Sequence, residues 1–224
     1  MNFLGRCNLC GFPVVKINSG YFGSRCVNCR STKIHRAIAL VIQSFSFSSE
    51  TSVYELSAGG SLFQYLKQQF LQFYYSEYFD DVTPGLMKAG IVCQDVQNLL
   101  LRDRSFDLVT SSEVFEHVPD DHQGFTEIYR ILKPNGNFIF TVPLGDELKT
   151  VERCKLMPDG TIQHFLEPEY HGDKIRGRNQ VLAFRNYGLD LVEKLQAVGF
   201  KAEIKVINSS AHLISEQKVI VATK

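Results

Sequence analysis

Residues 52–70, SVYELSAGGSLFQYLKQQF, combine a short apolar strand, a turn of small residues and an amphipathic helix. Small residues after a strand let a ligand approach the backbone at the carboxyl edge of a parallel sheet. The dinucleotide pattern G-x-G-x-x-G fails here, because Ser57 stands at its first glycine and Leu62 at its last. Glu55 at the end of the strand favours a cationic ligand, since a pyrophosphate prefers a helix N-terminus without a neighbouring acid.

Strand and helix patterns alternate along the chain on both sides of this unit. Further strands are predicted at residues 73–79, 89–95, 105–114 and 135–144, and helices at 124–134 and 186–200. This alternation predicts an α/β fold with a parallel sheet covered on both faces. Residues 201–207 and 216–223 fit two closing strands with no helix between them, which predicts an antiparallel hairpin at the edge of the sheet.

Four cysteines near the N-terminus are spaced as C-x2-C-x15-C-x2-C: Cys7, Cys10, Cys26 and Cys29. Four thiolates on two paired turns suit a tetrahedral Zn²⁺ ion. Residues 12–17 and 21–25 fit two short strands joined at 18–20, which predicts a zinc ribbon. Because protein fills all four positions, no site stays open for a catalytic water, and the zinc is predicted to be structural. Four free thiols or two disulfides are the alternatives.

A helix is predicted to connect the ribbon with the sheet. Ser31 fits the N-cap of a helix over residues 32–46, whose apolar face carries Ile34, Ile38, Val41, Ile42 and Phe45. The predicted organisation is a ribbon at residues 1–31, a linking helix at 32–49 and the sheet domain at 50–224.

The composition is that of a globular protein, with 44% apolar and 21% charged residues. Basic and acidic residues balance at 24 each, but residues 1–49 contain six basic residues and no acidic one. This excess fits two roles: offsetting the charge of a thiolate–zinc site, or binding nucleic acid beside the aromatic residues of the ribbon. No long apolar run fits a bilayer span and the N-terminus lacks a secretory pattern, so the expected location is the cytoplasm.

Three acidic residues end three successive strands: Glu55, Glu77 and Asp95. At such positions one acid can accept hydrogen bonds from a ribose diol, and the other two can bind an ammonium group and an exocyclic amine. S-adenosylmethionine carries an ammonium, a ribose diol and an adenine amine, so the three acids together predict a site for it. A single carboxylate at a strand end is more commonly a cap or a loop anchor.

Several segments resemble the successive motifs of class I SAM-dependent methyltransferases, most closely the broad methyltransferase type-11 group: residues 55–59, 76–79, 93–96, 106–118 and 130–136. The resemblance covers about residues 52–224 and implies a Rossmann-like, seven-stranded sheet whose last strand is antiparallel. The ribbon, residues 30–36 and residues 168–173 are similar to a bacterial subfamily linked to polysaccharide and secondary-metabolite genes.

The same resemblance implies a role for each residue of the cofactor site. Glu55 and Gly59 are expected near the methionine moiety, Glu77 at the ribose and Asp95 at the adenine. Ser57 and Ser112 are expected to complete the site. Ser57 and Ser61 stand where the family usually has glycine, so the turn keeps small residues but departs from the family pattern.

Methyl transfer needs an acceptor held in line with the methyl group, and an alcohol acceptor also benefits from a general base. Ser112, Glu113, Glu116 and His117 follow the fourth strand, and a helical turn would put Glu113 and His117 on one face. Both are candidate catalytic residues, with a capping role for His117 as the alternative.

Residues 145–184 are predicted to be irregular, and this length exceeds that of ordinary loops, which predicts a functional segment. His171 is a candidate catalytic residue there. A lid over the acceptor is favoured over a metal site built from His164, His171 and Glu167 or Glu169. Three arginines, at 176, 178 and 185, fit either an anionic acceptor or a solvated face.

The predicted function is an S-adenosylmethionine-dependent methyltransferase that acts on a small-molecule or glycan acceptor, at oxygen. Two other readings stay open. In one, the acceptor is RNA and the basic ribbon docks it. In the other, the methyltransferase domain is inactive and the ribbon serves an interaction.

Overall fold

The structure is a computed structural model that describes residues 5–17, 23–173 and 178–224. Its centre is a sheet of six strands in the order β16–β17–β9–β8–β4–β5. The strands are β4 (Ser52–Glu55), β5 (Gln72–Tyr75), β8 (Phe106–Ser112), β9 (Leu132–Thr141), β16 (Lys201–Ser209) and β17 (Ile214–Thr223). Strands β5, β4, β8 and β9 are parallel, whereas β17 is antiparallel to both β9 and β16, so the predicted closing hairpin is confirmed.

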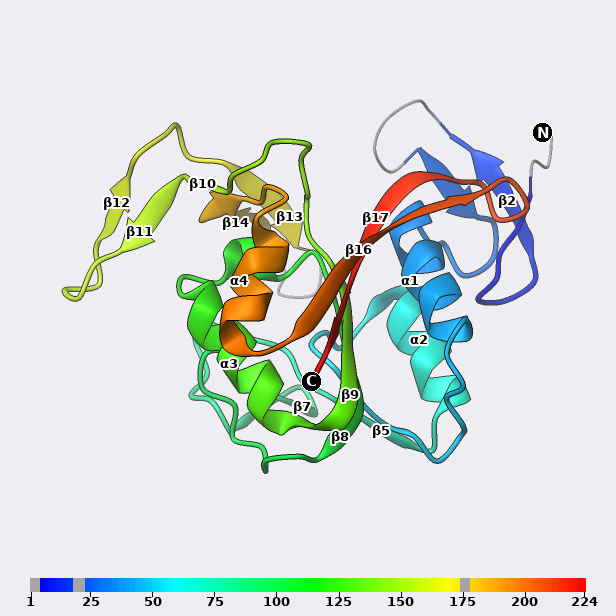
Figure 1. Cartoon of the computed structure of the whole chain (residues 1–224), viewed down its shortest axis with the longest axis horizontal. Helices are drawn as coiled ribbons and strands as arrows, with labels where there is room; N and C mark the ends of the chain where they lie inside the picture. The colour runs from blue at the N-terminus through cyan, green and yellow to red at the C-terminus, as the bar shows by residue number, and fades with distance from the viewer. Residues whose placement is uncertain (1–4, 18–22, 174–177) are drawn as a thin grey trace.

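Two helices cover each face of the sheet (Figure 1). Helices α1 (Lys33–Gln43) and α2 (Gly60–Gln69) lie on one face, and α3 (Asp121–Ile131) and α4 (Leu191–Val198) lie on the other. Successive strand residues point to opposite faces. Ile139 therefore packs with α1 and α2, while its neighbours Phe138 and Phe140 pack with α3 and α4. The predicted parallel sheet with both faces covered is confirmed.

The sheet has six strands where seven were predicted. Residues 89–95 join it only through a single parallel bridge between Glu77 and Cys93. The backbone nearby bonds to itself instead, as β6 (Met87–Lys88) and β7 (Ile91–Val92) form a hairpin. The bridge consists of two bonds, from the Glu77 amide to the Val92 carbonyl at 3.1 Å and from the Gln94 amide to the Glu77 carbonyl at 3.0 Å, while the Cys93 amide donates to the carbonyl of Leu86 on the other side at 2.8 Å.

The N-terminal segment forms a three-stranded antiparallel sheet of β1 (Gly5–Arg6), β2 (Pro13–Lys16) and β3 (Ser24–Cys26). The predicted connection at residues 18–20 lies outside the described residues. Helix α1 begins after Thr32, whose hydroxyl accepts from the amide of His35 at 3.2 Å, and not after Ser31 as predicted. Ser31 is turned towards the sulfur of Cys7, 3.2 Å away, and so is not available as a cap.

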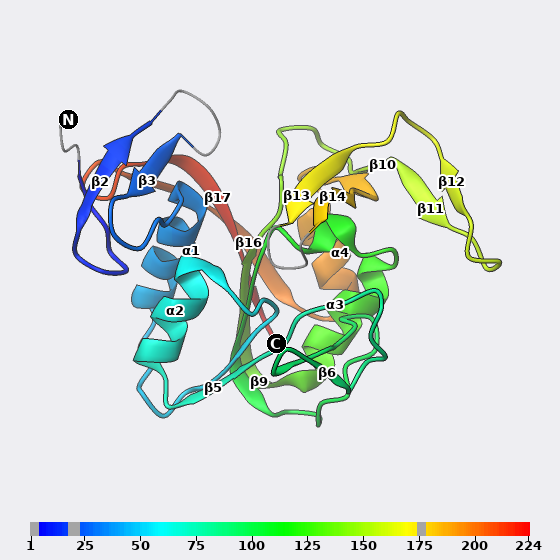
Figure 2. The same cartoon turned by 180° about the vertical axis from the view of Figure 1, so that it is seen from behind.

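This N-terminal sheet is joined to the turn between β16 and β17, at the other end of the sequence (Figure 2). The Arg6 amide donates to the carbonyl of Ala211 at 2.7 Å. A Cβ at Gly5 would lie 2.7 Å from that carbonyl oxygen, so only glycine allows this approach. Arg36 of α1 is fully buried and donates to Ser24, Ser31 and the 212–213 backbone.

Residues 145–184 were predicted to be irregular, and this prediction is wrong. The described part of this segment contributes to three short antiparallel strand pairs. The pairs are β10 (Val151–Glu152) with β15 (Arg185–Asn186), β11 (Cys154–Leu156) with β12 (Ile162–His164), and β13 (Tyr170–Asp173) with β14 (Arg178–Leu182). The β11–β12 pair extends away from the body of the molecule (Figure 1). Among the described residues, no helix has the length and apolar character needed to span a bilayer.

Candidate functional site

Glu55 ends β4 at the carboxyl edge of the sheet and is buried. The hydroxyl of Thr110, its register partner on β8, donates to Glu55 Oε2. Burial raises the pKa of Glu55 to about 8; the Thr110 bond opposes this shift and the nearby Glu77 adds to it. A cationic group bound here would reverse the effect of burial, because it stabilises the carboxylate.

The turn after β4 lies against Glu77. The Ser57 hydroxyl and the Ala58 amide donate to Glu77 Oε2 at 3.4 and 3.3 Å. Gly59 is the N-cap of α2 in an extended conformation, and Gly60 has a φ of +85°, which a residue with a side chain adopts only with strain. The structure therefore brings Glu55, Ser57 and Gly59 together with Glu77, as predicted from the order of the strands.

Asp95 anchors the turn that it begins. Its Oδ1 accepts from the amide of Gln97 at 2.9 Å, and the Gln97 side chain also reaches it. The Glu77–Cys93 bridge places Asp95 two residues beyond a partner of Glu77. Asp95 thus has the loop-anchoring role of many strand-end carboxylates.

Helix α1 contacts the start of α2, just after the turn at residues 57–60, through His35, which sequence reasoning missed. Nδ1 of His35 lies 2.7 Å from the hydroxyl of Ser61, so the serine that departs from the family pattern has a local partner. Burial lowers the pKa of His35 to about 4, and Arg25 and Arg36 lower it further. No sequence signal links the two residues, because their contact depends on how α1 packs against α2.

The end of β8 carries several buried polar atoms. Ser112 ends the strand, and Glu113 follows it with a φ of 56°. Within the described residues, Glu113 Oε1, Ser111 Oγ and Thr141 Oγ1 are buried without a hydrogen-bond partner. Burial raises the pKa of Glu113 to about 8, and the charge of Glu116 acts in the same direction. Buried polar atoms without a partner call for an explanation, and a bound water, ion or ligand is one.

His117 belongs to a 3₁₀ turn, η1 (Phe115–His117), and not to an α-helical turn shared with Glu113. It meets His171 of β13 edge to face, with ring centroids 4.9 Å apart. Glu116 Oε1 lies 3.6 Å from a ring nitrogen of each histidine. The first cause that raises the pKa of His171, to about 9, is this carboxylate, while burial opposes it and Glu169 contributes.

The structure therefore brings the predicted residues His117 and His171 together, and it adds Glu116. His164 and Glu167 are exposed and take no part in this group. Sequence reasoning placed Glu116 after the fourth strand but gave it no role. The adjacent residues Glu116 and His117 were the available signal in the sequence. They become a three-residue group only with His171, which comes from a distant segment.

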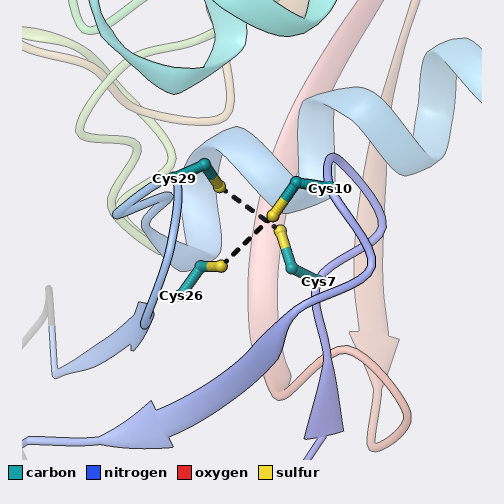
Figure 3. A group of neighbouring side chains, drawn as sticks. All are labelled: Cys7, Cys10, Cys26 and Cys29. Carbon is teal, nitrogen blue, oxygen red and sulfur yellow. Dashed lines mark hydrogen bonds between the residues drawn. The ribbon is translucent and has the colours of Figure 1, made fainter.

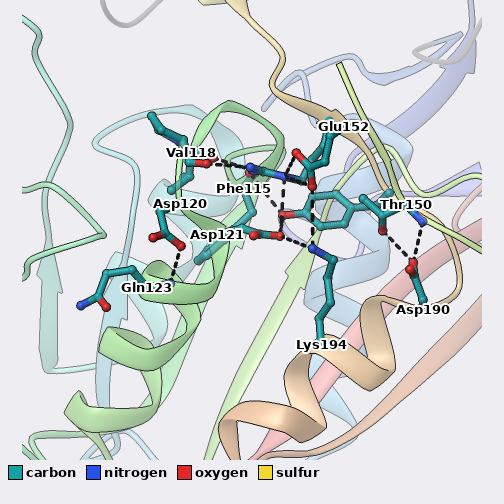
Figure 4. A network of polar contacts seen from close by, with 12 residues as sticks. Phe115, Val118, Asp120, Asp121, Gln123, Thr150, Glu152, Asp190 and Lys194 are labelled. Atoms are coloured by element: carbon teal, nitrogen blue, oxygen red, sulfur yellow. Dashed lines mark hydrogen bonds and ion pairs between the residues drawn. The ribbon is translucent and has the colours of Figure 1, made fainter. Parts of the chain in front are cut away.

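Arg185 holds the 3₁₀ turn η1 in position. Its buried guanidinium donates to the carbonyls of Phe115, Val118 and Pro119 and pairs with Glu152 at 3.2 Å. Figure 4 shows this network, in which Lys194 also reaches Asp121, at 3.3 Å. Arg185 is therefore neither part of a solvated face nor free for an anionic acceptor. Residue 176 and the side chain of residue 178 lie outside the described residues.

The four N-terminal cysteines converge on one point (Figure 3). The sulfurs of Cys7 and Cys29 are 3.6 Å apart, those of Cys10 and Cys26 are 3.4 Å apart, and all four lie within 4.8 Å of one another. A disulfide needs about 2.05 Å, and all four thiols are free. Tetrahedral Zn–S bonds of about 2.3 Å place sulfurs about 3.8 Å apart, so the group fits a four-thiolate zinc site.

The basic residues near this cluster are partly used inside the fold. Arg36 is buried beside the cysteines, whose thiolates favour its charged form while burial lowers its pKa. Its donors are directed to Ser24, Ser31 and the β16–β17 turn. Arg36 therefore offsets thiolate charge and is not exposed to a nucleic acid.

Residues 56–140 match a family model described as a methyltransferase domain. A malonyl-[acyl-carrier protein] O-methyltransferase from Methylovorus sp. is 33% identical over 94 residues, which cover 41% of this chain and 31% of that protein. An uncharacterized protein from Methanocaldococcus jannaschii is 28% identical over 122 residues, 54% of each chain. The chain thus spans about half or less of the length of these relatives.

Solved structures of S-adenosylmethionine-dependent methyltransferases share the fold. One from Mesorhizobium loti has a TM-score of 0.54 at 15% identity, over 84% of this chain and 96% of its own. The glycopeptide N-methyltransferase MtfA, solved with S-adenosylmethionine, has a TM-score of 0.54 at 19% identity, over 84% of this chain and 92% of its own. The fold of the chain is therefore that of these methyltransferases.

Proposed function

We propose that the chain is an S-adenosylmethionine-dependent methyltransferase that methylates an oxygen of a small-molecule or glycan intermediate. The observation that carries this proposal is the group formed by Glu55, Glu77 and the turn at residues 57–60, at the carboxyl edge of a sheet with the methyltransferase fold. The match of residues 56–140 to a methyltransferase domain supports it independently.

Each cofactor residue has a proposed role that follows from its chemistry. Glu55 pairs with the ammonium of the methionine moiety, beside Ser57 and Gly59. Glu77 accepts from the ribose diol, and Asp95 accepts from the adenine amine. A buried carboxylate binds a cation or donor strongly because water competes little there.

The acceptor is proposed to lie between Ser112 and the group formed by Glu113, His117 and His171. Its oxygen lone pair forms the new C–O bond as the C–S bond breaks, and that bonding pair stays on sulfur as S-adenosylhomocysteine leaves. Glu113, His117 and His171 are the titratable groups near the acceptor; Glu113 and His171, whose pKa values are about 8 and 9, can take its proton once they are deprotonated. The malonyl-[acyl-carrier protein] relative is an O-methyltransferase, which supports oxygen as the accepting atom.

The four cysteines are proposed to bind a structural zinc ion, with Arg36 balancing part of the thiolate charge. This assignment leaves the methyl-transfer chemistry to the sheet. The burial of Arg36 favours it over a ribbon that docks RNA.

Isothermal titration with S-adenosylhomocysteine tests the cofactor site. The wild-type protein is expected to bind one molecule per chain, and Glu77→Gln and Asp95→Asn should each weaken binding about tenfold or more, the cost of a lost bond to a charged group. Glu203→Gln, an exposed carboxyl on β16, serves as the control and should bind like wild type. A folded, zinc-loaded protein that binds no S-adenosylhomocysteine would refute the proposal.

A further inference from the structure

The hydrogen bonds of His117 define which of its ring nitrogens carries the proton. Nδ1 lies 2.8 Å from the carbonyl oxygen of Leu182. A carbonyl oxygen only accepts, so Nδ1 is the donor and Nε2 of the neutral ring presents a lone pair. That Nε2 lies 3.6 Å from Glu116 Oε1.

His171 repeats the same arrangement with its nitrogens exchanged. Its Nε2 lies 3.0 Å from Oε1 of Glu169, a carboxylate that only accepts, so Nε2 is the donor. The opposite nitrogen, Nδ1, faces the same Glu116 oxygen at 3.6 Å. Metal-binding histidines commonly donate their second N–H to a carboxylate or a backbone carbonyl, as these two do.

Glu116 is the third member of the group and is 1% exposed. Neither of its carboxylate oxygens receives a hydrogen bond from the part of the chain that the structure describes. A buried carboxylate is costly unless a positive charge lies beside it. Either a proton on His171 or a metal ion at this point would supply that charge.

The spacing of the three atoms fits a metal ion. Bonds of about 2.0–2.1 Å to imidazole nitrogen and carboxylate oxygen at tetrahedral angles put neighbouring ligand atoms about 3.4 Å apart. The two distances to Glu116 Oε1 are both 3.6 Å, and all three ligand atoms lie within 4.8 Å of one another.

We propose that Glu116, His117 and His171 bind a divalent transition-metal ion, distinct from the ion of the four cysteines. Imidazole and carboxylate ligands suit Zn²⁺ and its first-row neighbours. Three protein ligands leave at least one coordination position open, as in catalytic and not in structural sites. An oxygen of the methyl acceptor can occupy that position; only this last step rests on the proposed function.

Titration of the zinc-loaded protein with Co²⁺ and Zn²⁺ tests the site, because the cysteine cluster is then already filled. Wild type should bind one further ion per chain, and its cobalt spectrum should lack the thiolate charge-transfer band. Glu116→Gln and His171→Asn should each weaken this binding at least a hundredfold. His164→Asn, an exposed histidine on β12, should leave it unchanged.

Glu169→Gln keeps all three ligands and alters only the partner of His171, so it should weaken binding about 10–100-fold. Histidine NMR of the wild type needs no variant: Co²⁺ should shift or broaden the rings of His117 and His171 and spare those of His122 and His164. No ion beyond that of the cysteines, or effects on other histidines only, would overturn the proposal. Metal binding without S-adenosylhomocysteine binding would leave it standing and refute the proposed function instead.

Discussion

Glu55 is a carboxyl group whose protonation is coupled to folding. Its pKa is about 8 in the folded chain against an ordinary value of 4.5, so the folded state binds more protons between these values. Its contribution to stability is present in full below about pH 4.5 and is lost as the pH rises through 8. We expect Glu55→Gln to abolish this loss, so that the variant gains stability relative to wild type from pH 5 to pH 8.

Urea unfolding of the cofactor-free protein at several pH values measures this effect. Glu50→Gln, an exposed carboxyl just before β4, is the control and should follow the wild-type profile. If the difference in the free energy of unfolding between wild type and Glu55→Gln does not change with pH, the expected protonation of Glu55 is contradicted.

The positions of single residues were predicted well where they depend on the strand that carries the residue. Glu55 ends β4 and Glu77 lies two residues beyond β5, and parallel strands bring such ends to one edge whatever the rest of the fold does. Glu116 and His35 were missed for the opposite reason. Glu116 has meaning only beside His171, and His35 only beside Ser61, and neither contact follows from local periodicity.

At the scale of elements, the short strands between residues 145 and 186 were not predicted, because pieces of two to five residues show no period of their own. Arg185 of β15 holds the β10–β15 pair against residues 115–119, whereas the β11–β12 pair extends away from the body of the molecule. The missing seventh strand has a similar cause: the residues 85–93 satisfy one another, so the apolar run at 91–93 never needs a full ladder.

Arg185 should be the anchor of this region. Replacing it with Met removes its bonds to the carbonyls of Phe115, Val118 and Pro119 and its ion pairs with Asp121 and Glu152. We expect Arg185→Met to lower the free energy of unfolding by about 3–5 kcal/mol, the usual cost of breaking a buried ion pair.

Urea unfolding at neutral pH checks this expectation. Arg102→Met, an exposed arginine before β8, should change stability by less than about 0.5 kcal/mol. A similar loss in both variants would mean that Arg185 contributes no more than a surface charge does.

At the scale of the whole molecule, the ribbon should depend on its metal. Cys26→Ser removes one of four ligands, and four thiolates are not gathered without the ion. We expect the variant to lose the thiolate-bound ion and to unfold residues 5–31, which removes the ribbon partners of Arg36 while the apolar face of α1 stays on the sheet. The sheet keeps its own core and should still bind S-adenosylhomocysteine, with lower solubility.

Cobalt substitution measures the result through the thiolate charge-transfer absorption. Cys154→Ser, as buried as Cys26 but outside the cluster, should keep the full absorption. A Cys26→Ser protein that stays folded and binds cofactor but loses only methyl transfer would place this metal in the chemistry.

The contact between the N-terminal sheet and the β16–β17 turn has a consequence for biosynthesis. Residues 5–43 leave the ribosome well before Ala211 and the apolar side of β17, on which β1 and α1 rest. At 5–20 residues per second, this delay is roughly ten to forty seconds. During it the amphipathic helix α1 lacks the part of its packing surface that β17 supplies, and a ribbon loaded with the proposed zinc would hold the helix at one end until β17 is made.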